Sequence, residues 1–112
     1  MRRILFVVAA VAMATASAHA ADPIVGNWRT EAGTIAAIGP CGSGYCIVLK
    51  TGKHKGEQIG TFKGSGGHYA GRITDPDAGK TYDGTMTVSG NSVTMKGCVM
   101  RVFCQSQTWP RI

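Results

Sequence analysis

The sequence has 112 residues, of which 44% are hydrophobic and 16% are charged, and its formal net charge is +6. This length allows one small domain with a marginal core and excludes a multidomain protein. The 16 glycines follow no collagen-like or low-complexity period, which excludes a fibrous or repetitive chain. The positive charge favours contact with anionic surfaces, but the basic run at residues 50–55 is typical of a solvated loop.

The first twenty residues have the pattern of a targeting segment. Arg2 and Arg3 form a basic start, the apolar run after them is too short for a stable transmembrane helix, and residues 18–20 (Ala-His-Ala) match a cleavage site. We predict cleavage after Ala20, which leaves one domain at residues 21–112; a retained N-terminal anchor is the alternative. Cleavage predicts an exported protein, periplasmic or secreted, with no stable membrane span.

Short strands and tight turns dominate the rest of the chain, and no stretch has a long helical repeat. The expected strands lie at residues 24–30, 34–38, 45–50, 58–63, 68–74, 80–88, 92–99 and 104–111. About eight such strands predict an all-β fold, either an up-and-down antiparallel barrel or a small sandwich. Closure is favoured because an open sheet leaves two exposed edges. Glycines inside the expected strands would allow the coiling of a small barrel: Gly60, Gly71, Gly84 and Gly97.

The segment around residues 75–79 predicts a hairpin turn. Asp75 can accept hydrogen bonds from the backbone amides ahead of it, Pro76 fixes φ for a type I turn, and Gly79 can adopt a positive φ. Residues alternate between polar and apolar on both sides, which indicates strands with one buried face. The side expected to be buried carries Tyr69, Gly71, Ile73, Tyr82, Gly84, Met86 and Val88.

Four cysteines follow the targeting segment, and an even number in an exported chain predicts two disulfides. Because they lie in two close pairs, we expect Cys41 to bond Cys46 and Cys98 to bond Cys104. Pairing across the two units stays open, since a barrel can bring them together. We expect residues 39–44, rich in Gly and Pro, to form an irregular loop closed by the first disulfide.

Three motifs together resemble domain of unknown function 2147, a family of exported bacterial proteins. The motifs are Gly26-Asn27-Trp28, the segment from Gly71 to Tyr82 that contains Asp75-Pro76 and Gly79-Lys80-Thr81-Tyr82, and Ser106-Gln107-Thr108-Trp109-x-Arg111. The resemblance implies a lipocalin-like β-barrel, with ligand binding as an analogy. Gly26-x-Trp28 is also similar to the motif that opens lipocalin barrels, which implies that Trp28 closes the barrel floor and stacks on Arg111.

No pattern in the chain predicts catalysis or metal binding. Residues 78–81 (Ala-Gly-Lys-Thr) lack the earlier glycine and the helix of a phosphate-binding loop. Three other sets lack the pattern of a known site: a calcium set (Asp75, Asp77 and Asp83), a nucleophile set (Ser65, His68 and Asp75), and a carboxylate pair drawn from Glu31, Glu57 and the turn aspartates. We therefore expect no enzyme, no cofactor and no metal.

Ligand binding inside the barrel is the leading functional prediction. We expect a small apolar or amphipathic ligand, or a component of the cell envelope, and the candidate interior residues are Trp28, Ile35, Tyr69, Ile73, Tyr82, Met86 and Met95. Each of these is equally explained as core. The alternative is an envelope protein-interaction module, such as a hydrolase inhibitor, that uses the loops at residues 39–44 or 52–57. We expect no nucleic-acid binding, since the tyrosines fall on the buried face.

Overall fold

The computed structural model describes residues 22–99 and 103–112 of the chain. The predicted targeting segment, with its cleavage point after Ala20, lies outside these residues, as do residues 100–102 of the connection before the last strand. No helix within the described residues is long and apolar enough to cross a membrane.

Eight antiparallel strands form one sheet in which every strand pairs with its neighbours in sequence. They are β1 (Gly26–Arg29), β2 (Ile35–Cys41), β3 (Gly44–Leu49), β4 (Gln58–Ser65), β5 (His68–Asp75), β6 (Lys80–Ser89), β7 (Ser92–Val99) and β8 (Phe103–Pro110). A single bridge between Trp28 and Arg111 joins the first strand to the end of the last. The all-β, up-and-down barrel of about eight strands is therefore confirmed, and the barrel is nearly closed.

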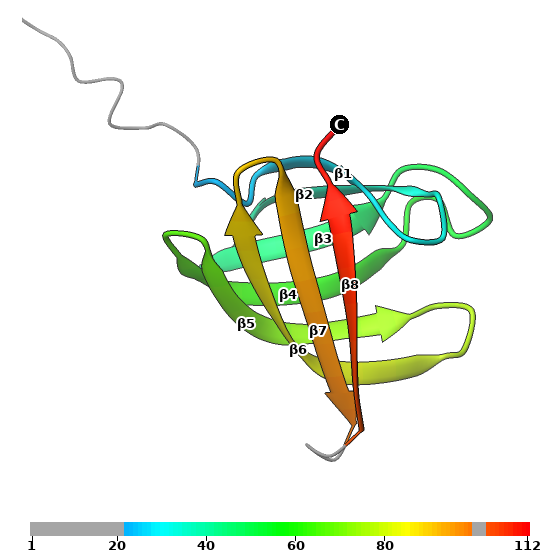
Figure 1. Ribbon diagram of the computed structural model, residues 1–112. Coiled ribbons are helices and arrows are strands. Elements are labelled where there is room, and N and C mark those ends of the chain that lie inside the picture. The colour runs from blue at the N-terminus through cyan, green and yellow to red at the C-terminus, as the bar shows by residue number, and fades with distance from the viewer. Residues whose placement is uncertain (1–21, 100–102) are drawn as a thin grey trace, which may run out of the picture.

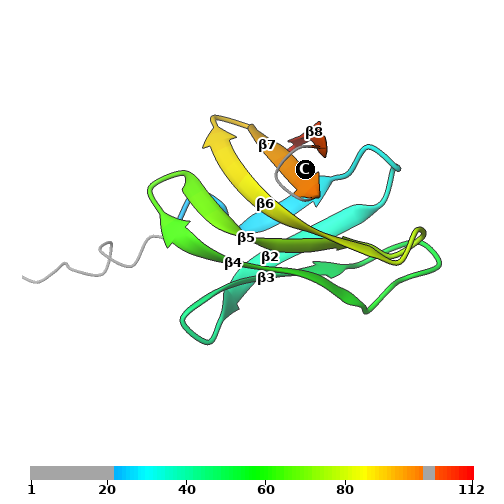
Figure 2. The same cartoon turned by 90° about the horizontal axis from the view of Figure 1, so that it is seen from below.

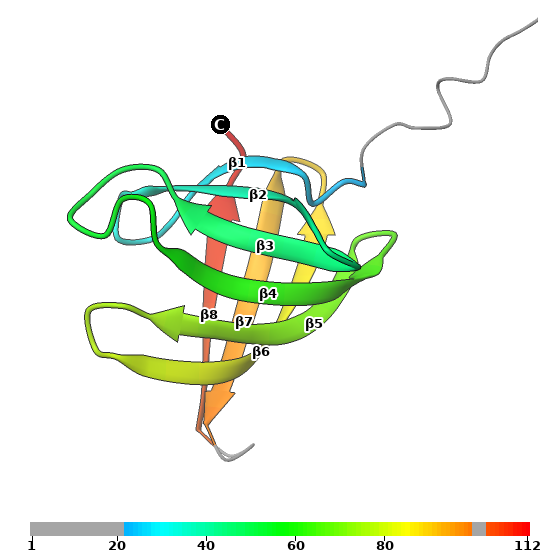
Figure 3. The ribbon, with the colours of Figure 1, turned by 180° about the vertical axis from the view of Figure 1, so that it is seen from behind.

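The sheet coils so that its two halves face each other (Figure 1). The strands β2 to β5 run across one side, and β7 and β8 run crosswise on the other, as the view from behind also shows (Figure 3). The long strand β6 bends from the first group into the second (Figures 1 and 2). Close approach of β4 and β5 supports the coiling, since a Cβ atom at Gly71 would overlap the backbone of Thr61 and Phe62.

Residues 39–44 differ from the irregular loop expected there. Strand β2 continues to Cys41 and β3 starts at Gly44, so only Gly42 and Ser43 form the turn. Pro40 fits inside β2 because β1 pairs only with residues 35–38, which leaves the edge beside Pro40 without a ladder partner. Gly39 and Pro40 therefore lie in a part of β2 that is an edge of the sheet, and the expectation of an irregular loop at residues 39–44 was wrong.

The interior of the barrel is lined by one face of each strand. Pairing places Tyr69 opposite Met86 and Ile73 opposite Tyr82, which is the register that the alternation around the hairpin predicts. The buried core includes Ile24, Trp28, Ile47, Phe62, Tyr69, Met86, Val93 and Met95. The prediction that Ile35 faces the interior was wrong. Ala36 and Ile38 are the buried residues of β2, and Ile35 lies on the opposite face of that strand.

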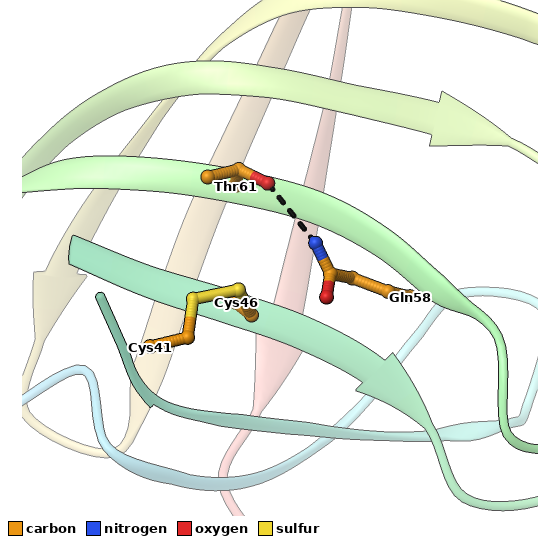
Figure 4. Close-up of a disulfide and its surroundings, with 4 residues drawn as sticks. All are labelled: Cys41, Cys46, Gln58 and Thr61. Atoms are coloured by element: carbon orange, nitrogen blue, oxygen red, sulfur yellow. Dashed lines mark hydrogen bonds between the residues drawn. A yellow bond between two sulfur atoms is a disulfide. The ribbon is translucent and has the colours of Figure 1, made fainter. Parts of the chain in front are cut away.

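Both disulfides have the pairing expected from their spacing. Cys41 bonds Cys46 across the hairpin of β2 and β3, and Cys98 bonds Cys104 at the directly opposed ends of β7 and β8. Figure 4 shows the first disulfide beside Gln58 and Thr61 of β4, whose side chains share a hydrogen bond of 3.2 Å. Cys46 points away from the core, because its neighbour Ile47 is the buried residue of that pair. This disulfide therefore staples the hairpin from the outer face.

Candidate ligand-binding cavity

The two ends of the barrel differ in the segments that cover them. One end carries the tight turns at residues 42–43, 66–67 and 90–91 together with residues 22–25, and we refer to it as the closed end. The other end carries the longer loops at residues 30–34 and 50–57 and the turn at residues 76–79, and we refer to it as the open end. These three segments lie on the same side of the barrel, at the right in Figure 1.

Trp28 seals the closed end. Its side chain is fully buried, and its indole Nε1 donates a hydrogen bond of 3.0 Å to the carbonyl of Ile24. The guanidinium of Arg111 lies 4.2 Å above the centre of the Trp28 ring, which is the contact that the resemblance to lipocalins implied. Arg111 also donates hydrogen bonds to the carbonyl oxygens of Val25 (3.1 Å) and Pro23 (2.7 Å). The cation therefore holds the incoming chain over the tryptophan.

A cavity of about 360 Å³ occupies the open end. Its apolar lining comes from Leu49, Ile59, Ile73, Tyr82, Met95 and Trp109. Its polar lining comes from the loops and the start of β8, and includes Thr30, Thr34, Lys53, His54, Gln105 and Gln107. This volume is within the range of about 300–1,000 Å³ that small-molecule sites commonly have. The arrangement of an apolar interior and polar groups at the loops suits a ligand that has both kinds of surface.

The turn after β5 forms one wall of this cavity, through Asp75, Pro76 and Asp77. The Asp75 Oδ1 atom accepts hydrogen bonds from the backbone amides of Asp77 (3.0 Å) and Ala78 (3.3 Å). Gly79 has φ of 66° and donates its amide to the carbonyl of Asp75 at 2.8 Å. The carboxylate of Asp75 therefore stabilises the turn, which leaves the side chain of Asp77 to contact the neighbouring loop.

His54, from the loop at residues 50–57, lies between two carboxylates at the mouth of the cavity. Its Nδ1 is 2.9 Å from Glu57 Oε2, and its Nε2 is 3.1 Å from Asp77 Oδ1. Lys53 Nζ lies 3.2 Å from the same Asp77 oxygen. The bonds to Glu57, and then those to Asp77, raise the pKa of His54 above its ordinary value. Hydrogen bonds from Lys53 and then from His54 lower the pKa of Asp77.

Strand β8 supplies polar groups to the cavity, a role that the terminal sequence motif containing Gln107 and Trp109 did not indicate. The Trp109 Nε1 atom donates a hydrogen bond of 2.7 Å to Gln107 Oε1, so this pair forms a polar spot on the cavity lining. On the side of β8 toward the loop at residues 30–34, the backbone amide of Thr108 donates to Glu31 Oε2 at 3.2 Å. A side chain therefore occupies the place of a ladder partner where the barrel is not closed by backbone pairing.

The structure divides the predicted interior residues into groups. Ile73, Tyr82 and Met95 line the cavity, whereas Trp28, Tyr69 and Met86 are buried core away from it, and Ile35 is on the outer face. Sequence reasoning missed Trp109, Gln107 and Gln105, although their alternation along β8 would have placed all three on one face. It also missed the contact between His54 and Asp77, which joins residues 23 positions apart.

The structure does not assemble the nucleophile set or the full calcium set, whereas two members of the carboxylate set, Glu57 and Asp77, both bond to His54. Ser65 ends β4 and His68 begins β5, both beside the turn at the closed end, whereas Asp75 ends β5 at the open end, roughly 23 Å from His68 at the usual rise per residue. Asp83 faces Arg72 across the hairpin of β5 and β6, away from the oxygens of Asp75 and Asp77 that the turn and loop contacts use. Among the described residues, no three His, Cys, Asp or Glu side chains are grouped to hold a metal ion.

Comparison with known proteins gives one family. The family described as an uncharacterized protein conserved in bacteria (DUF2147) matches residues 49–111, which is more than half of the chain. No curated protein and no solved structure matches the chain. The matched region contains β4 to β8 and most of the cavity wall, including Ile73, Tyr82, Met95 and Trp109.

Proposed function

The chain belongs to the DUF2147 family of bacterial proteins, and from its barrel we propose that it binds a small amphipathic molecule in the cavity at the open end. The cavity of about 360 Å³ is the observation that supports this proposal. The apolar surface of a ligand would move out of water and into contact with Leu49, Ile59 and Met95. Burial of such surface contributes roughly 25 cal/mol per Å². At the closed end, by contrast, the side chains of Trp28 and Ile24 are fully buried.

The polar lining favours a ligand head that forms hydrogen bonds. Threonine hydroxyls and glutamine amides both donate and accept, so the mouth can satisfy a hydroxyl, an amide or an ester. Three charged groups of the lining already contact one another, since Asp77 is bonded to Lys53 and to His54, and the fourth, Asp75, accepts hydrogen bonds from backbone amides of its own turn. The polar head of a ligand can therefore bond to the threonine and glutamine side chains without breaking the contacts of Asp77 with Lys53 and His54.

Export to the cell envelope is the second part of the proposal. Two disulfides among four cysteines are compatible with a compartment outside the cytoplasm, where thiols oxidise. The targeting pattern of the first twenty residues points the same way. In that location the barrel would carry or sense an amphipathic compound of the envelope. Fractionation of cells that express the full chain, with mass measurement of its N-terminus, tests cleavage and location together.

Two measurements test ligand binding. Mass spectrometry of organic extracts from protein purified under native conditions should find a bound amphipathic compound in substoichiometric or greater amount. Displacement of the neutral fluorophore N-phenyl-1-naphthylamine by that compound, or by decanol, should show saturable binding at one site. Failure of every amphiphile to bind, together with clean extracts, would sink the proposal.

A matched pair of alanines provides the control. Ala32 lines the mouth of the cavity, whereas Ala78 lies in the turn beside it and is not part of the lining. Both are exposed, so Ala32→Phe and Ala78→Phe should fold with similar stability. We expect Ala32→Phe to weaken binding of the fluorophore about tenfold and Ala78→Phe to leave it unchanged, in proportion to one blocked apolar contact. Equal affinity in both variants would place binding elsewhere.

A further inference from the structure

We propose that His54 is a protonation-dependent clasp across the mouth of the cavity, which slows ligand exchange when the imidazole is charged and releases it when the imidazole is neutral. The clasp joins the loop at residues 50–57 to the turn at residues 76–79. This regulation rests on the proposed function, because it acts on the same cavity.

The clasp is bonded on both sides of one ring. His54 contacts Glu57 within its own loop and Asp77 on the turn after β5. The loop is itself held in place by backbone bonds from Gly56 to the carbonyl of Leu49 and from Glu57 to the carbonyl of His54. The turn is held by the bonds to Asp75 Oδ1. Two structured segments that line the same mouth therefore meet mainly through one imidazole and one lysine.

The chemistry of these contacts requires a proton. A neutral imidazole has one N–H and one lone pair, and a lone pair cannot bond to an ionised carboxylate. Only the imidazolium donates from both nitrogens, so both short contacts of His54 are satisfied at once only in the charged form. Loss of the proton removes one bond and leaves a lone pair facing a carboxylate oxygen. One of the two exposed carboxylates then turns away from the ring, which loosens the contact between the loop and the turn.

The surroundings of His54 support the charged form. The ionisable groups that face it in the described residues are Glu57, Asp77 and, through Asp77, Lys53. With His54 protonated, two cations balance two carboxylates. The raised pKa of His54 agrees with this arrangement, and partial burial of the ring, which opposes the charge, is outweighed by the two bonds.

The pH window follows from the two shifted groups. Because the pKa of His54 is raised in the folded chain, the stabilisation it gives is complete below the ordinary value of 6.5 and is lost as pH rises through the folded value. Because the pKa of Asp77 is lowered, its part is complete above the ordinary value of 3.8 and is lost as pH falls through the folded value. The clasp is therefore strongest between these two ordinary values and opens as pH rises through the raised pKa of His54.

The first test needs no ligand. NMR titration of the full chain should give a His54 pKa above 6.5, and the backbone amides of Ala78 and Gly79 should follow the same titration, because they belong to the turn that His54 holds. The variant His54→Gln should remove that step from both amides. The variant His68→Gln, at an exposed histidine near the closed end, should leave it intact. Amides that ignore the His54 titration, or a His54 pKa at or below 6.5, would overturn the clasp.

The second test measures exchange. Dissociation of N-phenyl-1-naphthylamine, which stays neutral over this range, should become about two- to fivefold faster from pH 5.5 to pH 8.5, as suits an exposed ion pair. The His68→Gln variant should behave in the same way, and His54→Gln should dissociate fast at every pH. A dissociation rate that still depends on pH in the His54→Gln variant would also overturn the clasp. If the fluorophore and other amphiphiles do not bind at all, the proposed function fails, while the NMR titration still decides whether the clasp exists.

Discussion

The closed and open ends of the barrel are built from the same sheet, but one is filled by side chains and the other holds a cavity. At the closed end, tight turns and residues 22–25 bring Trp28 and Arg111 together, and the space between the strands is filled. At the open end, longer loops carry charged and hydroxyl groups, and a cavity remains between Ile73, Met95 and Trp109. In this barrel the filled end coincides with short turns and a stacked tryptophan, and the cavity coincides with longer loops.

A second difference lies in how each end is held. The closed end depends on a buried aromatic ring and hydrogen bonds to backbone carbonyls, which do not titrate between mild acid and mild base. The open end depends on contacts between ionisable side chains of two loops. We therefore expect the closed end to contribute most of the free energy of unfolding, and the open end to be the part whose contacts change with pH.

The largest effect should come from truncating the aromatic that seals the closed end. Trp28→Ala removes a fully buried ring together with its hydrogen bond and the stacked Arg111, so we expect a loss of about 3–5 kcal/mol in the free energy of unfolding. The half-buried Ile73→Ala, at the cavity, should cost about 1–2 kcal/mol, since part of that side chain already borders open space. Urea denaturation of both variants measures this. Equal losses would contradict the division between a filled and a hollow end.

The disulfides should separate stability from binding. Each closes a short loop, with sequence separations of 5 and 6, so replacing either pair by serines should cost about 2 kcal/mol by chain entropy. Only Cys98–Cys104 has direct neighbours in the cavity lining, namely Gly97 and Gln105. We therefore expect loss of Cys98–Cys104 to weaken binding of N-phenyl-1-naphthylamine, measured without denaturant at a temperature at which the variant is fully folded. Loss of Cys41–Cys46, on the outer face, should leave binding unchanged.

An effect of comparable or smaller size is expected at the turn after β5. Gly79→Val forces a β-branched residue to φ near 66° with no neighbouring atom in the way, so the cost is conformational, about 1–3 kcal/mol. Gly79→Asn should cost less, because asparagine tolerates the left-handed region. Thermal unfolding of both variants measures the difference. Identical melting temperatures for the wild type and Gly79→Val would show that this turn does not hold its wall of the cavity.

The sequence predicted the features that depend on local pattern. Alternation around the hairpin predicted the register of Tyr69 with Met86, and spacing predicted both disulfides. The resemblance of Gly26-x-Trp28 to the motif that opens lipocalin barrels implied the stacking of Arg111 on Trp28. It failed where the outcome depends on a neighbour distant in sequence. Pro40 could enter a strand only because β1 ends beside it. Ile35 was a separate failure of local pattern, because Ala36 and Ile38 are the buried residues of β2 and Ile35 alternates with them.

The cavity itself was beyond prediction from the chain alone. Whether Ile73 and Met95 pack against other side chains or border open space depends on how loops from three parts of the sequence meet. His54 looked like part of a solvated basic run, since nothing near it in sequence revealed Asp77 as its partner. Local pattern therefore predicted the sheet, and long-range contacts determined the candidate site.

The two tryptophans allow the most direct test of the central claim, since one lies at each end. The indole N–H of Trp28 is bonded to Ile24 in the filled end, and that of Trp109 is bonded to Gln107 in the cavity lining. A titration of the ¹⁵N-labelled chain with decanol, followed through the two indole signals, should shift the Trp109 signal in a saturable manner and leave the Trp28 signal in place. A shift of Trp28 alone, or no shift of Trp109 at saturating decanol, would contradict a ligand site at the open end.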